Sequence, residues 1–154
     1  MTKHELAHIY FESDIPLRLA FVNEMLNEFE DAIGERLPVY LRTSLVEDLC
    51  FAINVLDDVR VNSLWGALFP GDGVKIESWY FGELGPDMSR KAQKQYGNSV
   101  PHLFTYMVLI TLEQDVWSNR WNHLGPLIAD AAEDVKFKTF PAGLLIMKRL
   151  IHQI

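Results

Sequence analysis

The sequence contains a single cysteine, Cys50, so no disulfide can form within the chain. Its longest apolar stretch, residues 103–112, is about half of the roughly 20 residues that a membrane-spanning helix needs. Residues 1–12 carry charged and histidine side chains throughout, unlike a secretory signal peptide. These absences predict a soluble, cytoplasmic protein that makes no membrane contact.

Basic side chains are also scarce. The chain has 14 Lys and Arg against 21 Asp and Glu, a formal net charge of −7. All of the excess acidity lies in residues 1–80, which hold 14 acidic and 6 basic side chains. Such a chain lacks the cations that release counterions from a phosphate backbone, which excludes direct nucleic-acid binding. An acidic surface suits a basic protein partner instead.

Hydrophobic residues, in contrast, are plentiful. They make up 49% of the 154 residues, and charged residues make up 23%, which excludes a disordered chain. No internal repeat, linker or change of composition divides the sequence. We therefore expect one globular domain spanning residues 1–154, with a core large enough to fold without metal or disulfide support.

Apolar residues recur at helical spacing along most of the chain. This predicts a mostly α-helical fold, an irregular or orthogonal bundle of about six to seven helices. One helix is expected over 38–58 and a separate short one over 62–69. The longest, central helix is expected over 101–123. In the helix that follows Ser13 and Asp14, the expected core face is Ile15, Leu19, Val22, Leu26, Phe29 and Ile33.

Two short segments alternate between apolar and polar residues, as β-strands do. They are residues 74–77 and 135–138, and a turn is expected just before the first, at residues 70–73. The sequence therefore allows a small two-stranded patch added to the helices.

One motif carries metal chemistry. His4-Glu5-Leu6-Ala7-His8 has the spelling His-Glu-x-x-His and resembles the signature of zinc metalloproteases. On a helix the two imidazoles share one face and could bind one zinc ion, with Glu5 as general base. A third protein ligand is needed. Glu12 lies too far along the helix, and His102, His123 or His152 would serve only if the fold brought one close.

The same residues also have a purely structural interpretation. Thr2 and Glu5 are spaced as the two members of a helix-capping box, which places both histidines near a solvated helix end. The sequence favours this interpretation. It therefore assigns no catalytic residue, no metal ion and no cofactor, and leaves a site at His4 and His8 as the alternative.

Two sets of residues suggest a surface that binds another protein. Glu24, Glu28, Asp31 and Glu35 form a stripe on the face opposite the expected core, without an intervening lysine. We call these four residues the acidic stripe; it is either a docking surface for a cationic partner or an ordinary solvated face. Trp117 and Trp121, four residues apart, are either interface anchors or residues that close one end of the core.

The function favoured by these features is that of a non-enzymatic, acidic protein-binding module. It would neutralise or inhibit a basic partner, such as a nuclease or another nucleic-acid-handling protein, as toxin-immunity proteins and phage inhibitors do. The first alternative is a minimal zinc-dependent hydrolase built on His4, Glu5 and His8. The second is a structural, self-assembling subunit, since a homo-oligomer is possible.

Overall fold

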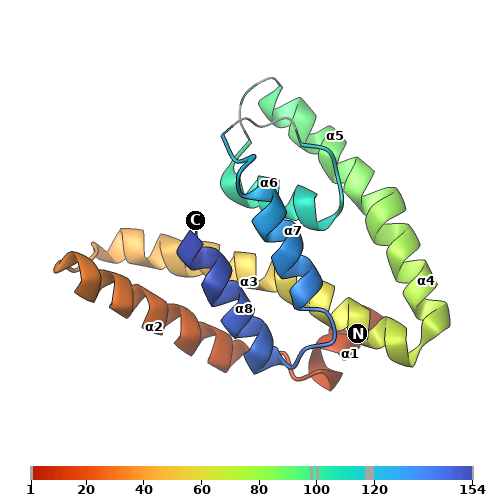
Figure 1. Ribbon diagram of the computed structural model, residues 1–154, viewed down its shortest axis with the longest axis horizontal. Coiled ribbons are helices and arrows are strands. Elements are labelled where there is room, and N and C mark those ends of the chain that lie inside the picture. Colours follow the sequence, from red (N-terminus) through yellow and green to blue (C-terminus); the bar gives the residue numbers. More distant parts are fainter. Residues whose placement is uncertain (1, 98, 100, 117–119, 154) are drawn as a thin grey trace.

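The computed structural model describes residues 2–97, 99, 101–116 and 120–153, and helices dominate these ranges (Figure 1). The elements are α1 (Lys3–Tyr10), α2 (Ile15–Ile33), α3 (Val39–Leu68), α4 (Pro70–Trp79), the π-helical turn η1 (Tyr80–Leu84), α5 (Gly85–Tyr96), α6 (Leu103–Thr111), α7 (Gly125–Asp134) and α8 (Phe140–Gln153). The predicted all-helical class is confirmed. None of these helices is both long and apolar enough to cross a membrane.

The first two helices begin where the sequence predicts. The side chain of Thr2 accepts a hydrogen bond from the backbone N–H of Glu5, and the Glu5 carboxylate accepts one from the N–H of Thr2. This complete capping box satisfies two backbone donors that the first turn of α1 would otherwise leave unpaired. Asp14 caps α2 in a similar way, and Gly34 ends α2 in the left-handed conformation that favours glycine.

Helix α3 is the longest element and runs through the centre of the fold. The expected break at residues 62–63 is wrong: the helix continues to Leu68, and the Ser63 hydroxyl donates to the carbonyl of Arg60.

The expectation of a longest helix over 101–123 is also wrong. Helix α6 stops at Thr111, because Glu113 takes a positive φ of 57°. The later part of that expected helix includes residues 117–119, which lie outside the described residues.

The chain turns sharply at Phe69, and α4, η1 and α5 then form one continuous rod along the edge of the molecule (Figure 1).

The expected two-stranded patch is wrong: residues 74–77 lie inside α4, and Val135 caps the end of α7. Proline at the first position of α4 favours a helix there rather than the expected turn. Gly73 of α4 also lies so close to Gly66 of α3 that a Cβ on Gly73 would stand 3.0 Å from the Gly66 Cα.

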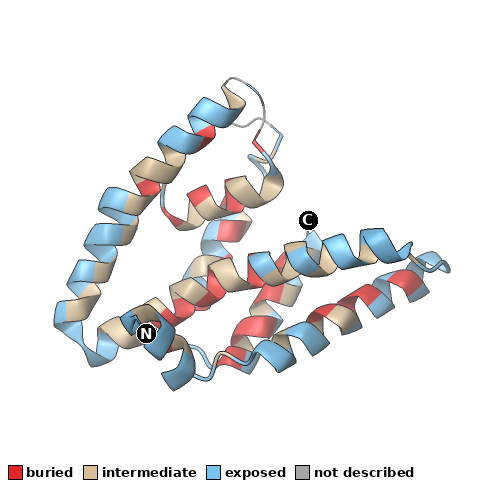
Figure 2. Ribbon diagram, turned by 180° about the vertical axis from the view of Figure 1, so that it is seen from behind, coloured by how far each residue is buried: buried red, intermediate tan, exposed pale blue. Residues whose placement is uncertain are grey.

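The core lies where α3, α6, α7 and α8 meet, with α2 along one side (Figure 2). The expected core face of α2 is correct only in its middle: Val22 and Leu26 are buried, whereas Ile15, Leu19, Phe29 and Ile33 are exposed. Helix α2 packs mainly on α3, so only a narrow stripe of its surface is covered. Glu30 of α2 is buried as well and pairs with Arg42.

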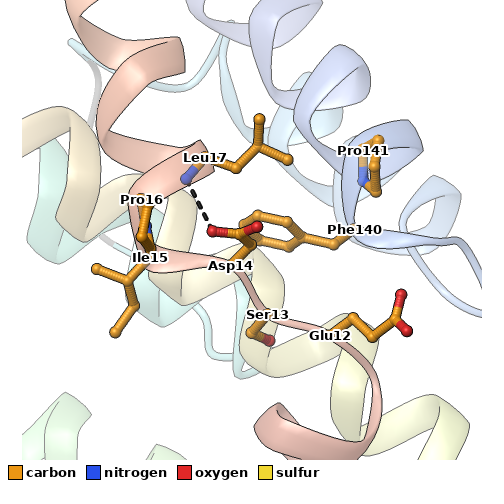
Figure 3. Close-up of a pocket in the computed structure, with 8 residues that line it drawn as sticks. All are labelled: Glu12, Ser13, Asp14, Ile15, Pro16, Leu17, Phe140 and Pro141. Carbon is orange, nitrogen blue, oxygen red and sulfur yellow. Dashed lines mark hydrogen bonds between the residues drawn. The ribbon is translucent and has the colours of Figure 1, made fainter.

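Helix α8 holds the loop that joins α1 to α2. The side chain of Phe140, 3% exposed, points from the start of α8 towards this loop (Figure 3). A hollow of about 550 Å³ lies between the two, lined by Glu12, Ser13, Asp14, Ile15, Pro16, Leu17, Phe140 and Pro141. The position of the loop matters because it brings Ser13 next to α1 and α3.

Candidate metal centre

Side chains from α1 and α3 converge at one point. His4 and His8 lie one turn apart on α1, and Asp58 projects from α3. The Nε2 atoms of the two histidines are 3.1 Å apart. Asp58 Oδ1 lies 3.1 Å from Nε2 of His4 and 3.0 Å from Nε2 of His8. The three atoms thus form a nearly equilateral triangle.

The other nitrogen of each imidazole faces an oxygen atom. His4 Nδ1 lies 3.2 Å from Asn62 Oδ1. His8 Nδ1 lies 2.8 Å from the Ser13 hydroxyl and 3.1 Å from Asp57 Oδ2. An amide oxygen and a carboxylate accept but do not donate, so both Nδ1 atoms carry the proton. In the neutral imidazole, each Nε2 atom then presents a lone pair to the triangle.

The triangle therefore brings together three hydrogen-bond acceptors and no donor when both histidines are neutral. Three such atoms at 3.0–3.1 Å repel one another unless a cation lies among them. These three atoms are close enough together that Nε2 of His4, Nε2 of His8 and Oδ1 of Asp58 could hold one zinc ion. The histidine contacts with Asn62 and Asp57 are of the kind that orients metal-binding imidazoles.

Protons supply positive charge at this centre when no metal is bound. Hydrogen bonds to Asp57 and then Asp58 raise the pKa of His8 to about 9, although burial acts in the opposite direction. Burial raises the pKa values of Asp57 and Asp58, but the hydrogen bonds that they accept outweigh it, so both values are lowered. Near neutral pH, His8 is thus an imidazolium paired with two carboxylates. A proton and a metal ion would compete for this position.

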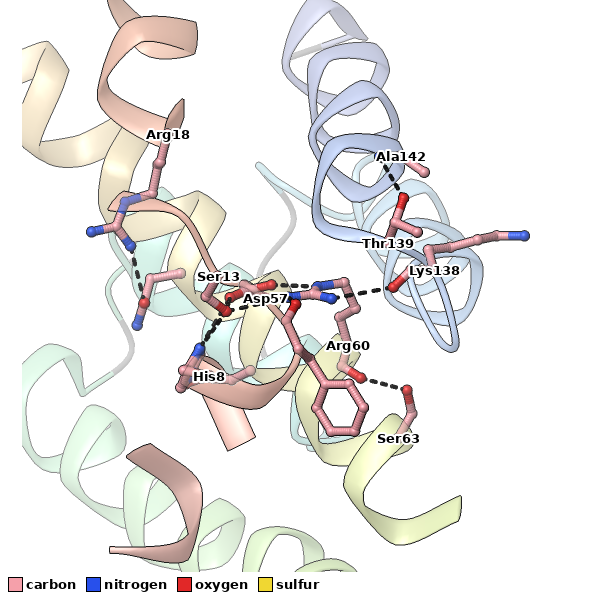
Figure 4. A network of polar contacts seen from close by, with 12 residues as sticks. His8, Ser13, Arg18, Asp57, Arg60, Ser63, Lys138, Thr139 and Ala142 are labelled. Carbon is pink, nitrogen blue, oxygen red and sulfur yellow. Dashed lines mark hydrogen bonds and ion pairs between the residues drawn. The ribbon is translucent and has the colours of Figure 1, made fainter. Parts of the chain in front are cut away.

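A buried arginine fixes the oxygens behind His8 (Figure 4). Arg60 is 1% exposed, and its Nε donates to Asp57 Oδ1 at 2.6 Å. Its terminal nitrogens donate to the Phe11 carbonyl, the Ser13 hydroxyl and the Lys138 carbonyl, at 3.1–3.2 Å. One guanidinium thereby joins α3 to the loops before α2 and before α8, and it leaves the second oxygen of Asp57 directed at His8.

A large cavity adjoins the centre. It has a volume of about 780 Å³ and lies among α3, α4, η1, α6 and α7. Asp58 and Asn62 belong both to the metal centre and to the wall of this cavity. Tyr80 lines the wall beside them and hydrogen-bonds to Asn62, and burial raises the pKa of its phenol. A molecule in the cavity would therefore approach the carboxylate face of the centre.

The glutamate of the His-Glu-x-x-His motif does not take part. Glu5 is engaged with Thr2 in the capping box, and the hydrogen bond from the Thr2 backbone lowers its pKa. The third candidate ligand is Asp58. The sequence had suggested only His102, His123 or His152 for this place. His102 instead caps α6, where its side chain accepts from the N–H of Phe104.

The other predicted site residues lie elsewhere. All four residues of the acidic stripe are exposed on or just beyond α2, and Glu28 pairs with Lys148 of α8 at 3.2 Å. Trp121 is partly buried against the core, and its Nε1 donates to the Pro101 carbonyl at 2.8 Å. Trp117 lies outside the described residues. The position of Trp121 is the one expected of a residue that closes the core.

Asp57, Asp58, Arg60 and Asn62 are not among the residues predicted from the sequence. Their signal is in the pattern of α3, where Ile53, Asp57 and Arg60 fall on one helical face and all three are buried. Charged residues at core positions are rare unless they are paired, so this interruption of an apolar face marks a built polar site.

Comparisons with protein-family models, with curated proteins and with solved structures found no match for this chain. Geometry alone therefore defines the class of the protein. Over the described residues it is an all-helical domain with a candidate His-His-Asp metal centre next to a large cavity.

The pair between Arg60 and Asp57 should dominate the stability of this region. Replacing Arg60 with Met removes the closer of the two cations that pair with the buried Asp57 carboxylate and leaves it with His8 alone, and we expect the free energy of unfolding to fall by about 3–5 kcal/mol. Arg90→Met is the matched control, because Arg90 is exposed and pairs with Asp87 on the surface. Urea unfolding should show no measurable change for the control. Equal stability of both variants would contradict the role assigned to Arg60.

The metal-free protein should lose stability as the pH rises. The pKa of His8 is about 9 in the folded chain against 6.5 for a free imidazole, so its contribution is complete below pH 6.5. That contribution disappears as the pH rises through about 9. Unfolding midpoints measured from pH 6 to 10 in the presence of a chelator should fall over this window, as expected for one titrating imidazole. In His8→Gln the decline should be absent, and a wild-type midpoint that stays level would contradict the assignment.

Proposed function

We propose that this chain is a metal-dependent enzyme of the hydrolytic type, with a zinc ion bound by Nε2 of His4, Nε2 of His8 and Oδ1 of Asp58. The observation that carries the proposal is the convergence of three atoms that can ligate a metal, Nε2 of His4, Nε2 of His8 and Oδ1 of Asp58, which lie 3.0–3.1 Å apart. Both imidazoles are turned by Nδ1 contacts so that Nε2 faces the centre. This arrangement favours metal binding over the interpretation of His4 and His8 as solvated residues near the end of a helix.

The number of ligands supports catalysis over a structural role. Structural zinc sites are closed by four protein ligands, whereas catalytic sites have three and leave a position for water or substrate. Zinc lowers the pKa of a bound water to about 7, so a hydroxide nucleophile forms near neutral pH without Glu5 as the base. Asp57 is held by Arg60 and Ser13, and its role is to position His8.

The proposal predicts one zinc ion per chain. Stoichiometry measured by mass spectrometry of metals should be about one, and it should be lost in His8→Ala and Asp58→Ala. Asp57→Asn should retain the site with about 10–100-fold weaker affinity, since residues behind the ligands orient them. Titration at pH 7 should release about one proton, because His8 must lose a proton to bind the ion.

His123→Ala is the control for these variants, because His123 is an exposed histidine outside the cluster. It should bind zinc as tightly as the wild-type protein does. No metal above background, or equal affinity in all of these variants, would overturn the proposal. Ferrous iron bound in preference to zinc would retain the site but contradict hydrolysis, since two histidines and one carboxylate also serve iron oxygenases.

A second candidate function is the acidic protein-binding module. Its support is that all four residues of the acidic stripe are exposed to solvent. A row of exposed carboxylates suits a partner that presents basic groups, such as a nuclease surface. This function would use a different face of the molecule from the metal centre.

Charge reversal tests the second candidate. In the double variant Glu24→Lys and Asp31→Lys, binding to a basic partner should weaken, and its dependence on salt should become shallower. The matched control is Glu133→Lys with Asp134→Lys, an exposed acidic pair on α7. If the stripe variant binds a captured partner as tightly as wild type at low salt, the stripe is an ordinary solvated face.

A further inference from the structure

The cavity beside the metal centre has the size and polarity of a small-molecule site. Its volume of about 780 Å³ lies within the roughly 300–1,000 Å³ typical of ligand pockets. Most of its wall is apolar, and the side chains include Phe51, Val55, Val59, Phe81, Leu84 and Ile110. Polar groups converge at one edge, where Asp58, Asn62 and Tyr80 stand next to the metal centre.

The charges of the wall restrict what can bind. Away from the metal edge, the solvent-exposed residues Glu77, Glu113 and Glu133 are among those that line the cavity, and the cation Lys136 is paired with Glu133 at 2.8 Å. These groups disfavour an anion. A zinc ion with one carboxylate ligand leaves the metal edge positive, which disfavours a cation there. An uncharged molecule with one oxygen donor satisfies both restrictions.

We infer that the cavity binds an uncharged, mainly apolar carboxylic ester, with its carbonyl oxygen at the metal edge beside Asp58 and Asn62. This inference rests on the proposed function, since the metal centre supplies the chemistry. A zinc ion held by His4, His8 and Asp58 would activate a water; in the hydrolysis the oxygen of that water bonds to the ester carbonyl carbon, and the bond from that carbon to the alcohol oxygen breaks. A proton from the water passes to the departing alkoxide, so one ester and one water give one acid and one alcohol.

Two probes test the inference. The zinc-loaded protein should hydrolyse para-nitrophenyl hexanoate, an uncharged apolar ester, and it should bind the neutral dye Nile red more tightly than the anionic dye anilinonaphthalene sulfonate. Ala129→Trp places a large ring at the cavity from an exposed position on α7. It should lower kcat/KM and Nile red affinity by about tenfold or more while leaving zinc content unchanged.

Ala32→Trp is the matched control, since Ala32 is an exposed alanine on α2 away from the cavity. It should resemble the wild-type protein in every measurement. His8→Ala should lose zinc and hydrolysis but still bind Nile red, which separates the cavity from the metal.

The outcomes distinguish the two proposals. Zinc-loaded protein that neither binds Nile red nor cleaves the ester would overturn the inference and leave the metal site intact. Nile red binding without any zinc binding would overturn both ester hydrolysis and the proposed function. The accessible surface, 9311 Å², exceeds the roughly 8,000 Å² usual for this mass, so a second copy is the competing occupant. A dimer in sedimentation that Ala129→Trp dissociates would assign the cavity to that contact and overturn the inference.

Discussion

The buried ion pair between Arg60 and Asp57 is the interaction on which the rest of the arrangement depends. A charged pair removed from water is stable only when its remaining donors and acceptors are satisfied. Here the guanidinium reaches backbone carbonyls at Phe11 and Lys138, so the loops on both sides of α3 are held to it. The ring of Phe140 also lies 5.4 Å from the guanidinium carbon, a cation–π contact that covers it from the α8 side.

The same pair explains why polar side chains gather beside α1. Asp57 uses one oxygen for Arg60 and the other for His8 and Ser13, so the position of the His8 ring follows from the position of the arginine. Asp58, the next residue, turns to the neighbouring side of α3 and meets both imidazoles. Two adjacent aspartates on one helix thus have separate roles, one in orienting a histidine and one in completing the triangle. The cost of bringing these groups together is offset by a cation, which is the His8 proton below about pH 9 in the metal-free chain and a metal ion in the proposed enzyme.

The sequence predicts much of the fold and little of the centre. Helix starts at Thr2 and Asp14 depend on neighbours a few residues away, so they are readable from local pattern, as is the left-handed glycine after α2. The continuation of α3 past residue 62, where the Ser63 hydroxyl bonds back to Arg60, and the end of α6 before the positive φ of Glu113 are not recorded in the spacing of apolar residues. The His4 and His8 pair is visible in the sequence, but Asp58 stands 50 residues beyond His8, and only the crossing of α1 over α3 brings them together. A second sequence signal, not used in the prediction, is the placement of Asp57 and Arg60 at helical spacing from Ile53 on an otherwise apolar face of α3.

The most direct test of the account is a crystal structure of the zinc-loaded protein with anomalous diffraction measured on both sides of the zinc absorption edge. The account predicts one strong anomalous peak about 2.0–2.2 Å from His4 Nε2, His8 Nε2 and an Asp58 oxygen, with a water or ligand on the open side. It also predicts that Glu5 remains in its capping box, away from the ion. A peak at any other group of residues, or an empty triangle in crystals grown with zinc, would contradict the account.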